Sequence, residues 1–126
     1  MTDGNFDKGY AARAAMFGQD KAERALNQPG QVAAKFQRLM TGYCFGALWA
    51  DDSISARDRS VITMSLLAAQ GKADELKVHA GLALRNGVEA SVLTELAQHV
   101  AVYCGIPAGA LATRIIQEAL DEKKPL

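Results

Sequence analysis

The chain has 126 residues, a formal net charge of zero and 49% hydrophobic residues. This length and composition predict one globular domain, residues 1–126, with a hydrophobic core of its own. The balanced charge, without a basic run, argues against a nucleic-acid partner. No apolar stretch approaches the roughly 18 residues that a membrane helix needs, so no membrane association is predicted.

The ends and the cysteines indicate a cytoplasmic protein. The first ten residues, MTDGNFDKGY, are polar and lack the apolar core of a signal peptide. Cys44 and Cys104 stand apart, without a CxxC pair or metal-ligand spacing. We expect two reduced, partly buried thiols. With only two histidines and no clustered ligands, no metal site is predicted.

Helical signals follow one another along the whole chain, and no alternating strand pattern of useful length interrupts them. Glycine and proline separate the segments. The predicted helices cover residues 6–17, 21–26, 32–50, 55–69, 72–86, 91–104 and 107–121. The predicted fold class is therefore all-α, with six or seven helices.

The helix at residues 55–69 is expected to be central. Ser55 and Asp58 resemble a capping box at its start, with Asp in place of the usual Glu. The residues that follow are apolar on most sides of the helix. Several other helices are also rich in Ala, Leu and Val on more than one face. Because a chain of this size has little interior to hide them, we predict a homo-oligomer.

Two histidines are candidates for proton transfer. Glu75 and His79 lie four residues apart in a helical stretch, which places a carboxylate and an imidazole on one face. The next helix carries His99 and Tyr103. Histidine titrates near neutral pH, as a general acid or base requires. The alternatives are a hydrogen-bonded core histidine at position 79, a solvated Glu75, and an interface or core histidine at position 99.

At this point the ordered residues resemble the carboxymuconolactone decarboxylase family, over about residues 6–120. The strongest stretches are Arg59-Ser60, Glu75-Leu76 with His79, Asn86-Gly87, His99-Val100-Ala101 and Tyr103-Cys104-Gly105-Ile106-Pro107-Ala108. Arg13, Gly18, Phe36-Gln37, Tyr43, Gly46 and Trp49 also fall where the family pattern has them. The resemblance implies an AhpD-like all-α subunit that assembles into trimers or hexamers, with sites near subunit contacts.

The resemblance also implies an activity. It is the cofactor-independent decarboxylation of 4-carboxymuconolactone to 3-oxoadipate enol-lactone in the protocatechuate branch of the β-ketoadipate pathway, or of a closely related lactone acid. When carbon dioxide leaves, the electron pair of the broken C–C bond moves through the ring alkene to the lactone carbonyl. The substrate therefore contains its own electron acceptor, and no cofactor is needed. Such an enzyme must hold carboxylates, stabilise the developing enolate and deliver a proton to carbon.

These tasks suggest roles for the charged residues. His79 is the candidate proton donor, oriented or kept charged by Glu75, and His99 is a second acid or an enolate donor. Arg13 and Arg59 are candidate substrate-binding residues, because a guanidinium binds a carboxylate bidentately. The alternatives are an exposed helix residue for Arg13 and, for Arg59, a salt bridge near Asp58 or the acidic residues of the preceding loop.

Two aromatic residues, Tyr43 and Trp49, are candidate walls of the substrate site, and core packing is the alternative for both. Three other positions depart from the family pattern by being small: Ala14, Ala47 and Gly81. A different or smaller acid, or a non-catalytic ligand-binding relative, would suit these changes.

A thiol redox partner is the other alternative. The wider superfamily contains peroxiredoxin-linked disulfide reductases with a CxxCxxxH motif. In this chain the two cysteine positions of that motif hold Lys72 and Glu75, and only His79 remains. Thiol–disulfide exchange needs an attacking and a resolving thiol, and Cys44 and Cys104 lie in other predicted helices. This activity is therefore disfavoured.

Overall fold

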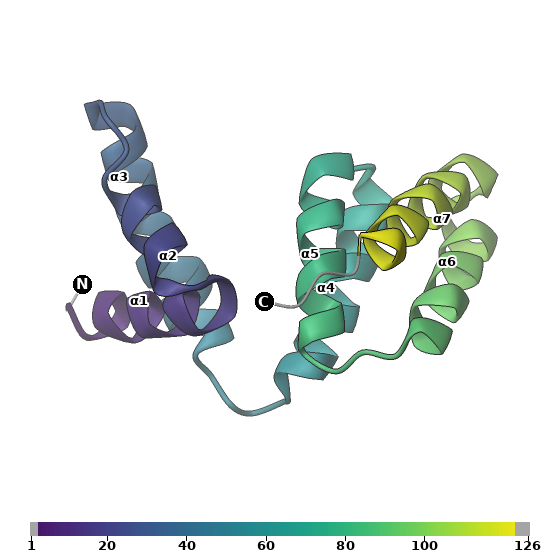
Figure 1. The fold of residues 1–126 in the computed structure, drawn as a ribbon, viewed down its shortest axis with the longest axis horizontal. Coiled ribbons are helices and arrows are strands. Elements are labelled where there is room, and N and C mark those ends of the chain that lie inside the picture. The colour runs from purple at the N-terminus through teal and green to yellow at the C-terminus, as the bar shows by residue number, and fades with distance from the viewer. Residues whose placement is uncertain (1–2, 123–126) are drawn as a thin grey trace. The chain divides into compact units, whose positions relative to one another are not determined.

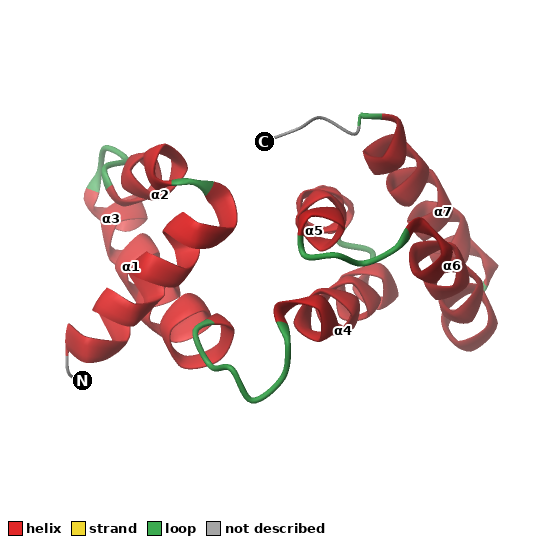
Figure 2. Cartoon of the chain, turned by 60° about the horizontal axis from the view of Figure 1, so that its bottom comes forward, coloured by secondary structure: helices red, strands yellow, loops and turns green. Residues whose placement is uncertain are grey.

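The protein is described by a computed structural model that covers residues 3–122. All regular structure in this range is helical (Figure 2). The helices are α1 (Asp3–Phe17), α2 (Gln19–Leu26), α3 (Gln31–Met40), the π-helix η1 (Thr41–Trp49), α4 (Ala56–Gln70), α5 (Ala73–Arg85), α6 (Ala90–Cys104) and α7 (Ile106–Asp121). The all-α prediction is confirmed, and among these residues no helix is long and apolar enough to cross a membrane.

Contacts along the chain form two compact units, unit 1 (Met1–Ile54) and unit 2 (Ser55–Leu126). Unit 1 holds α1, α2, α3 and η1, and unit 2 holds α4 to α7 (Figure 1). The single domain expected from the chain length stays a prediction.

In unit 1, α1 packs closely against η1. The close approach depends on glycine, because a Cβ at Gly9 would collide with the carbonyl oxygen of Thr41. A Cβ at Gly46 would likewise collide with the backbone of Asn5. These two glycines therefore allow the backbones of the two helices to touch.

Residues 32–50 were predicted as one continuous α-helix, and this is wrong in detail. The first part is α3, and the second part is η1, which has the wider i→i+5 hydrogen bonding of a π-helix. One such bond joins the amide of Ala50 to the carbonyl of Phe45 at 2.8 Å. Nine residues are too few for their apolar periodicity to distinguish a π-helix from an α-helix.

Unit 2 is a bundle of four helices around α4 and α7. Helix α4 packs against α5, α6 and α7, and α7 packs against α5 and α6. Met64, Leu76 and Leu93 are fully buried at the centre. Helix α4 contacts the other three helices, but the central position expected for it is wrong, because its outer face leaves Ile62 and Leu66 exposed.

A two-residue turn makes α4 and α5 antiparallel. Gly71 adopts the left-handed conformation at φ 70°, and the amide of Lys72 donates to the carbonyl of Leu67 at 3.0 Å. At the other end of the pair, the side-chain amide of Asn86 donates to Ser60 Oγ at 3.0 Å. Ser60 is fully buried, so this bond fixes the register of the two helices.

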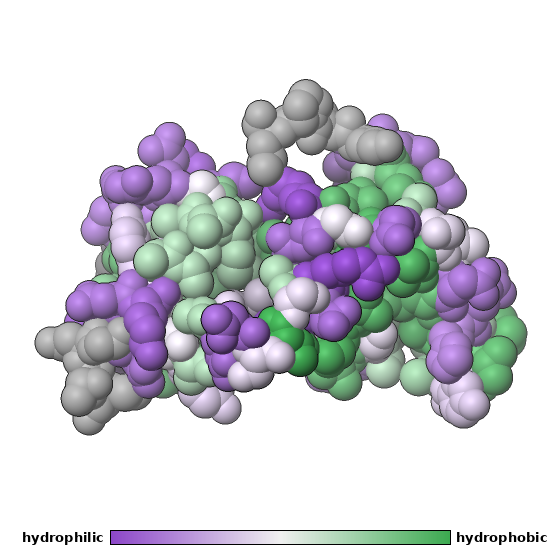
Figure 3. Space-filling view, turned by 90° about the horizontal axis from the view of Figure 1, so that it is seen from below, coloured by the Kyte–Doolittle hydropathy of each residue, from purple (hydrophilic) through white to green (hydrophobic). Residues whose placement is uncertain are grey.

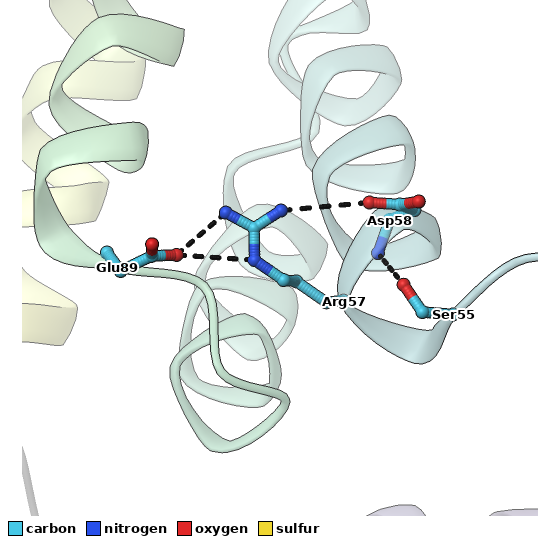
Figure 4. Close-up of polar contacts among 4 residues, drawn as sticks. All are labelled: Ser55, Arg57, Asp58 and Glu89. Atoms are coloured by element: carbon cyan, nitrogen blue, oxygen red, sulfur yellow. Dashed lines mark hydrogen bonds and ion pairs between the residues drawn. The ribbon is translucent and has the colours of Figure 1, made fainter.

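The predicted cap at Ser55 is present. Ser55 Oγ accepts a hydrogen bond from the amide of Asp58 at 3.0 Å (Figure 4). The Asp58 carboxylate lies 3.7 Å from Arg57, whose Nε and Nη2 also donate to Glu89 Oε1 at 3.2 and 2.7 Å. Glu89 immediately precedes α6, so this exposed ion pair connects the beginning of α4 with the beginning of α6.

Both units leave large apolar side chains exposed. In unit 1 these include Val32, Phe36, Leu39 and Tyr43, and in unit 2 Ile62, Leu66, Val102, Tyr103 and Ile106. The surface in Figure 3 shows hydrophobic residues (green) next to hydrophilic residues (purple). Exposed apolar area of this kind is the physical basis of the predicted homo-oligomer, which stays a prediction.

Candidate active site

His79 lies on the flank of α5, beside the face that packs into the core. Leu76, Ala80 and Ala83 bury that face, while His79 itself is partly buried and its Nδ1 atom is fully enclosed. Burial lowers the pKa of His79 below its ordinary value, and the nearby negative charge of Glu75 opposes this with a smaller effect. The imidazole is therefore held mainly in its neutral form at neutral pH.

Glu75 is exposed, as its solvated alternative predicted, yet its charge still reaches His79. It lies in the first turn of α5, where a carboxylate is favoured by the helix dipole. His79 in turn is only partly buried, so it faces an edge of unit 2 and not the centre of its core. The pair can therefore be reached by a ligand.

Arg59 lies on the neighbouring helix, α4, and is partly buried. The bond between Ser60 and Asn86 places Arg59 level with the C-terminal end of α5. His79 is seven residues earlier on α5, which corresponds to about two turns, or ~10 Å, along the helix. The backbone positions of Arg59 and His79 are therefore about two helical turns apart along the α4–α5 pair.

His99 belongs to a different feature, a groove of about 400 Å³ between α4 and α6. The groove is lined by Val61, Ser65, Val92, Glu95, Leu96, His99, Val100, Tyr103 and Cys104. The rings of His99 and Tyr103 are stacked, with centroids 5.1 Å apart and an angle of 21° between the planes. His99 is exposed, so the core alternative for this residue is wrong.

The two histidines therefore occupy different parts of unit 2. The groove takes its side chains from α4 and α6 alone, and His79 is on α5. Ser65 and Glu95 also line the groove, although neither was a predicted site residue. The signal for Glu95 was present, since Glu95, His99 and Tyr103 recur every four residues along one face of α6.

In unit 1, Arg13 is partly buried and points inward, so the alternative of an exposed helix residue is wrong. Its Nη1 donates to Gln37 Oε1 at 2.8 Å and to Thr41 Oγ1 at 3.3 Å, and the guanidinium lies 5.0 Å from the centre of the Phe45 ring. These partners are all neutral. Burial lowers the pKa of Arg13, which is the signature of a cation removed from water, and proximity to Cys44 partly offsets this effect.

Gln37 and Thr41, the residues that hold Arg13, were not among the predicted site residues. Both are buried, and Thr41 Oγ1 also donates to the carbonyl of Gln37 at 2.7 Å. Two polar residues four apart within an apolar helix are a usable signal, because buried polar side chains need hydrogen-bond partners. The pair predicts a buried polar partner such as Arg13.

The remaining candidates differ in their surroundings. Tyr43 is 71% exposed, so core packing is wrong for this residue, whereas Trp49 is partly buried. Cys44 is partly buried as expected, and burial raises the pKa of its thiol, which outweighs the lowering by Arg13. Cys104 is exposed, so the expectation of a partly buried thiol is wrong there.

Comparison with known proteins shows relatives over nearly the whole chain. The sequence model described as the carboxymuconolactone decarboxylase family matches residues 34–118. A 4-carboxymuconolactone decarboxylase from Acinetobacter baylyi is 27% identical over 117 residues, covering 93% of this chain and 87% of that protein. A nitrosuccinic acid decarboxylase from Metarhizium robertsii is 30% identical over 117 residues, covering 93% of this chain and 82% of that protein.

Proposed function

Because the chain belongs to the carboxymuconolactone decarboxylase family, we propose that it is a cofactor-independent carboxy-lyase acting on a small polycarboxylic acid. The observation that carries this proposal is that two relatives with 27% and 30% identity, spanning both units, are decarboxylases of such acids. The half-buried imidazole of His79 beside Glu75 supplies the proton-transfer group that the reaction needs.

The two relatives indicate the substrate class. In 4-carboxymuconolactone the leaving carboxylate is attached to the saturated γ-carbon, next to the alkene that is conjugated with the lactone carbonyl. In nitrosuccinic acid it is attached to the carbon that bears the nitro group. In both, the C–C bond breaks, carbon dioxide leaves, and the electron pair passes to the acceptor before a proton adds to carbon. We therefore propose a substrate with a carboxylate beside an electron acceptor and a second carboxylate for binding.

The first substrate to test is 4-carboxymuconolactone, with 3-oxoadipate enol-lactone as the product in the β-ketoadipate pathway. The small residues at Ala14, Ala47 and Gly81 favour a smaller or less charged acid as a competing choice. Nitrosuccinic acid is such an acid, and it has the same arrangement of two carboxylates and an electron acceptor. The two compounds should be compared directly.

We assign His79 the role of proton donor to carbon. In the free protein burial keeps this imidazole mainly neutral. An anionic substrate bound next to it would raise its pKa, so the proton would be taken up on binding and delivered after carbon dioxide leaves. The negative charge of Glu75 also raises the pKa of His79 and so favours the charged imidazolium.

The other residues are proposed to bind substrate. Arg13 is a half-buried cation held by neutral partners and is suited to a carboxylate, and Arg59 is a second candidate. His99 lies in a different part of unit 2 from His79, so it is not assigned a step beside this residue, and Tyr43 and Trp49 are proposed as walls of the site. A homo-oligomeric, cytoplasmic enzyme, trimeric or hexameric, completes the proposal.

The test is ultraviolet turnover with freshly generated 4-carboxymuconolactone and, separately, nitrosuccinic acid. Wild type is compared with His79→Gln and with the control Gln98→Ala, an exposed residue of α6 outside the groove lining. We expect a loss of kcat of about 10²–10⁴-fold in His79→Gln, the usual contribution of general acid–base catalysis, and wild-type rates in the control. Turnover that survives in His79→Gln contradicts the role of this residue.

Two outcomes would support other functions. Saturable binding of either acid without turnover by folded protein would indicate a non-catalytic ligand-binding relative. Loss of activity in the Cys44→Ser, Cys104→Ser double variant would indicate thiol chemistry, which the raised pKa of Cys44 disfavours because fewer thiolates form.

A further inference from the structure

Four large apolar residues form a line along the outside of unit 1. Val32, Phe36, Leu39 and Tyr43 are 87%, 55%, 61% and 71% exposed. They follow one another at intervals of four, three and four residues along α3 and the beginning of η1. This spacing is that of a coiled-coil seam, in which apolar residues recur every 3.5 residues and pack against another helix. We call these four residues the seam.

The groove of unit 2 has the same spacing on its α6 wall. Val92, Leu96, His99 and Tyr103 line it at intervals of four, three and four residues, and Val61 and Ser65 of α4 form the opposite wall. The seam and the α6 wall each extend over eleven residue steps, which corresponds to about 16 Å of ideal α-helix. The groove, at about 400 Å³, is open and mainly apolar in lining.

From this match we propose that the seam of one copy of the chain docks in the groove of a second copy. An amphipathic helix that places residues at such spacing into an apolar groove is a common mode of recognition. The contact joins two different surfaces, so each copy can give its seam to one neighbour and accept the seam of another. Such a head-to-tail contact closes into a ring or an exchanged dimer.

The charges around the two surfaces agree with this pairing. Residues 31–49 contain Lys35 and Arg38 and no acidic residue. Helix α6 contains Glu95 as its charged residue, and Glu95 lines the groove. A basic helix meeting an acidic groove is attracted, whereas two seams facing each other would bring like charges together. The charges therefore favour seam against groove over seam against seam.

The first test measures the mass of the assembly by light scattering during size-exclusion chromatography at micromolar protein. Phe36→Glu places a charge in the seam, and Leu48→Glu is the matched control, since Leu48 is 50% exposed in the same unit but outside the seam. We expect the wild type and Leu48→Glu to assemble and Phe36→Glu to dissociate, with an affinity at least tenfold weaker. A monomeric wild type, or equal behaviour of the two variants, overturns the proposal.

Mixing identifies which surfaces meet. Phe36→Glu blocks the seam alone, and Tyr103→Arg blocks the groove alone, because Tyr103 is 78% exposed at its edge. Each variant by itself should be monomeric, and the mixture should form a heterodimer through one intact seam and one intact groove. A mixture that stays monomeric overturns the proposal. Assembly of Tyr103→Arg by itself also overturns it, since that is the result of seam-to-seam contact.

A natural thiol in the groove gives a second, independent measurement. In a chain with Cys44→Ser, a cysteine is introduced by Val32→Cys or by Tyr43→Cys, at either end of the seam. Mild oxidation should link one of these two variants to Cys104 of another copy, giving a band of twice the chain mass on a non-reducing gel. No linked dimer from either variant, or a dimer that persists after Cys104→Ser, overturns the proposal.

Discussion

Gly9 is the residue whose replacement tests the packing of unit 1 most directly. In Gly9→Ala the new methyl group would collide with the carbonyl oxygen of Thr41 and would lie 2.8 Å from the amide nitrogen of Gly46. Both are backbone atoms, so no side-chain rotation can relieve the collision. Helix α1 would have to move away from η1.

The size of the effect follows from two opposing contributions. Overpacking of this kind costs about 1–3 kcal/mol, and a collision with backbone belongs at the upper end. Alanine recovers about 1 kcal/mol because it is a better helix former than glycine. The net loss should be about 1–2 kcal/mol, which lowers the Tm by about 3–10 °C for a chain of this size.

Gly81→Ala is the matched control, the same change within another helix. At Gly81 the nearest atom to a new Cβ is Arg85 Nη1 at 3.9 Å, an ordinary contact with a flexible side chain. This variant should gain about 0.5–1 kcal/mol. Thermal unfolding followed by circular dichroism compares the two variants. Changes of the same sign in both would refute the reasoning, because only the backbone contact separates the two sites.

The same substitution has a functional consequence. Arg13 lies one turn after Gly9 on α1 and donates to Thr41, the residue whose carbonyl the new methyl group meets. A shift of α1 should loosen this bond, so under the proposed function Gly9→Ala should raise KM for a dicarboxylate more than it lowers kcat. An unchanged KM in folded protein would mean that Arg13 does not contact substrate.

Three other predictions concern unit 2. Met64→Ala should lower the free energy of unfolding by about 2–5 kcal/mol, since a fully buried side chain leaves a cavity, and urea denaturation measures this. Arg57→Ala should leave the urea midpoint almost unchanged at any salt concentration, because exposed ion pairs contribute little. His79 should make the free energy of unfolding depend on pH, because the pKa of its imidazole in the folded protein lies below the ordinary 6.5. As the pH drops below about 6.5, the unfolded chain takes up a proton on His79 before the folded protein does. The free energy of unfolding should therefore fall.

The controls for these predictions use the same urea assay. Between pH 7.5 and 5.5, His79→Gln should lose less free energy of unfolding than the wild type, because the variant lacks the imidazole that takes up the proton. An identical pH dependence in wild type and variant would contradict the burial of this imidazole. A loss in Met64→Ala no larger than that in Arg57→Ala would contradict the core assignment of Met64.

The pH profile of activity gives a related reading of His79. Under the proposed mechanism, kcat/KM reports the lowered pKa of the free protein, and kcat reports the higher pKa of the complex with an anionic substrate.

The sequence by itself determined where the α-helices lie and the nature of several of their ends, but not that Thr41–Trp49 is a π-helix. Gly71 and Gly105 separate helices because their positive φ angles suit glycine, and Ser55 begins α4 because its hydroxyl can accept from a free amide. These are local effects, decided within a few residues. For the same reason the pairing of Glu75 with His79 on one face of α5 could be predicted from their spacing alone.

Only the tertiary structure decided how far each of these side chains is removed from water. Arg13 and Tyr43 were both candidates of uncertain exposure, yet Arg13 is held inside unit 1 by Gln37 and Thr41, and Tyr43 lies outside. Helical periodicity identifies an apolar stripe but not the helix that covers it, so the exposed seam could not be foreseen. The separation of His99 from His79 likewise depends on which helices pack around α4, a choice made by contacts between residues far apart in the chain.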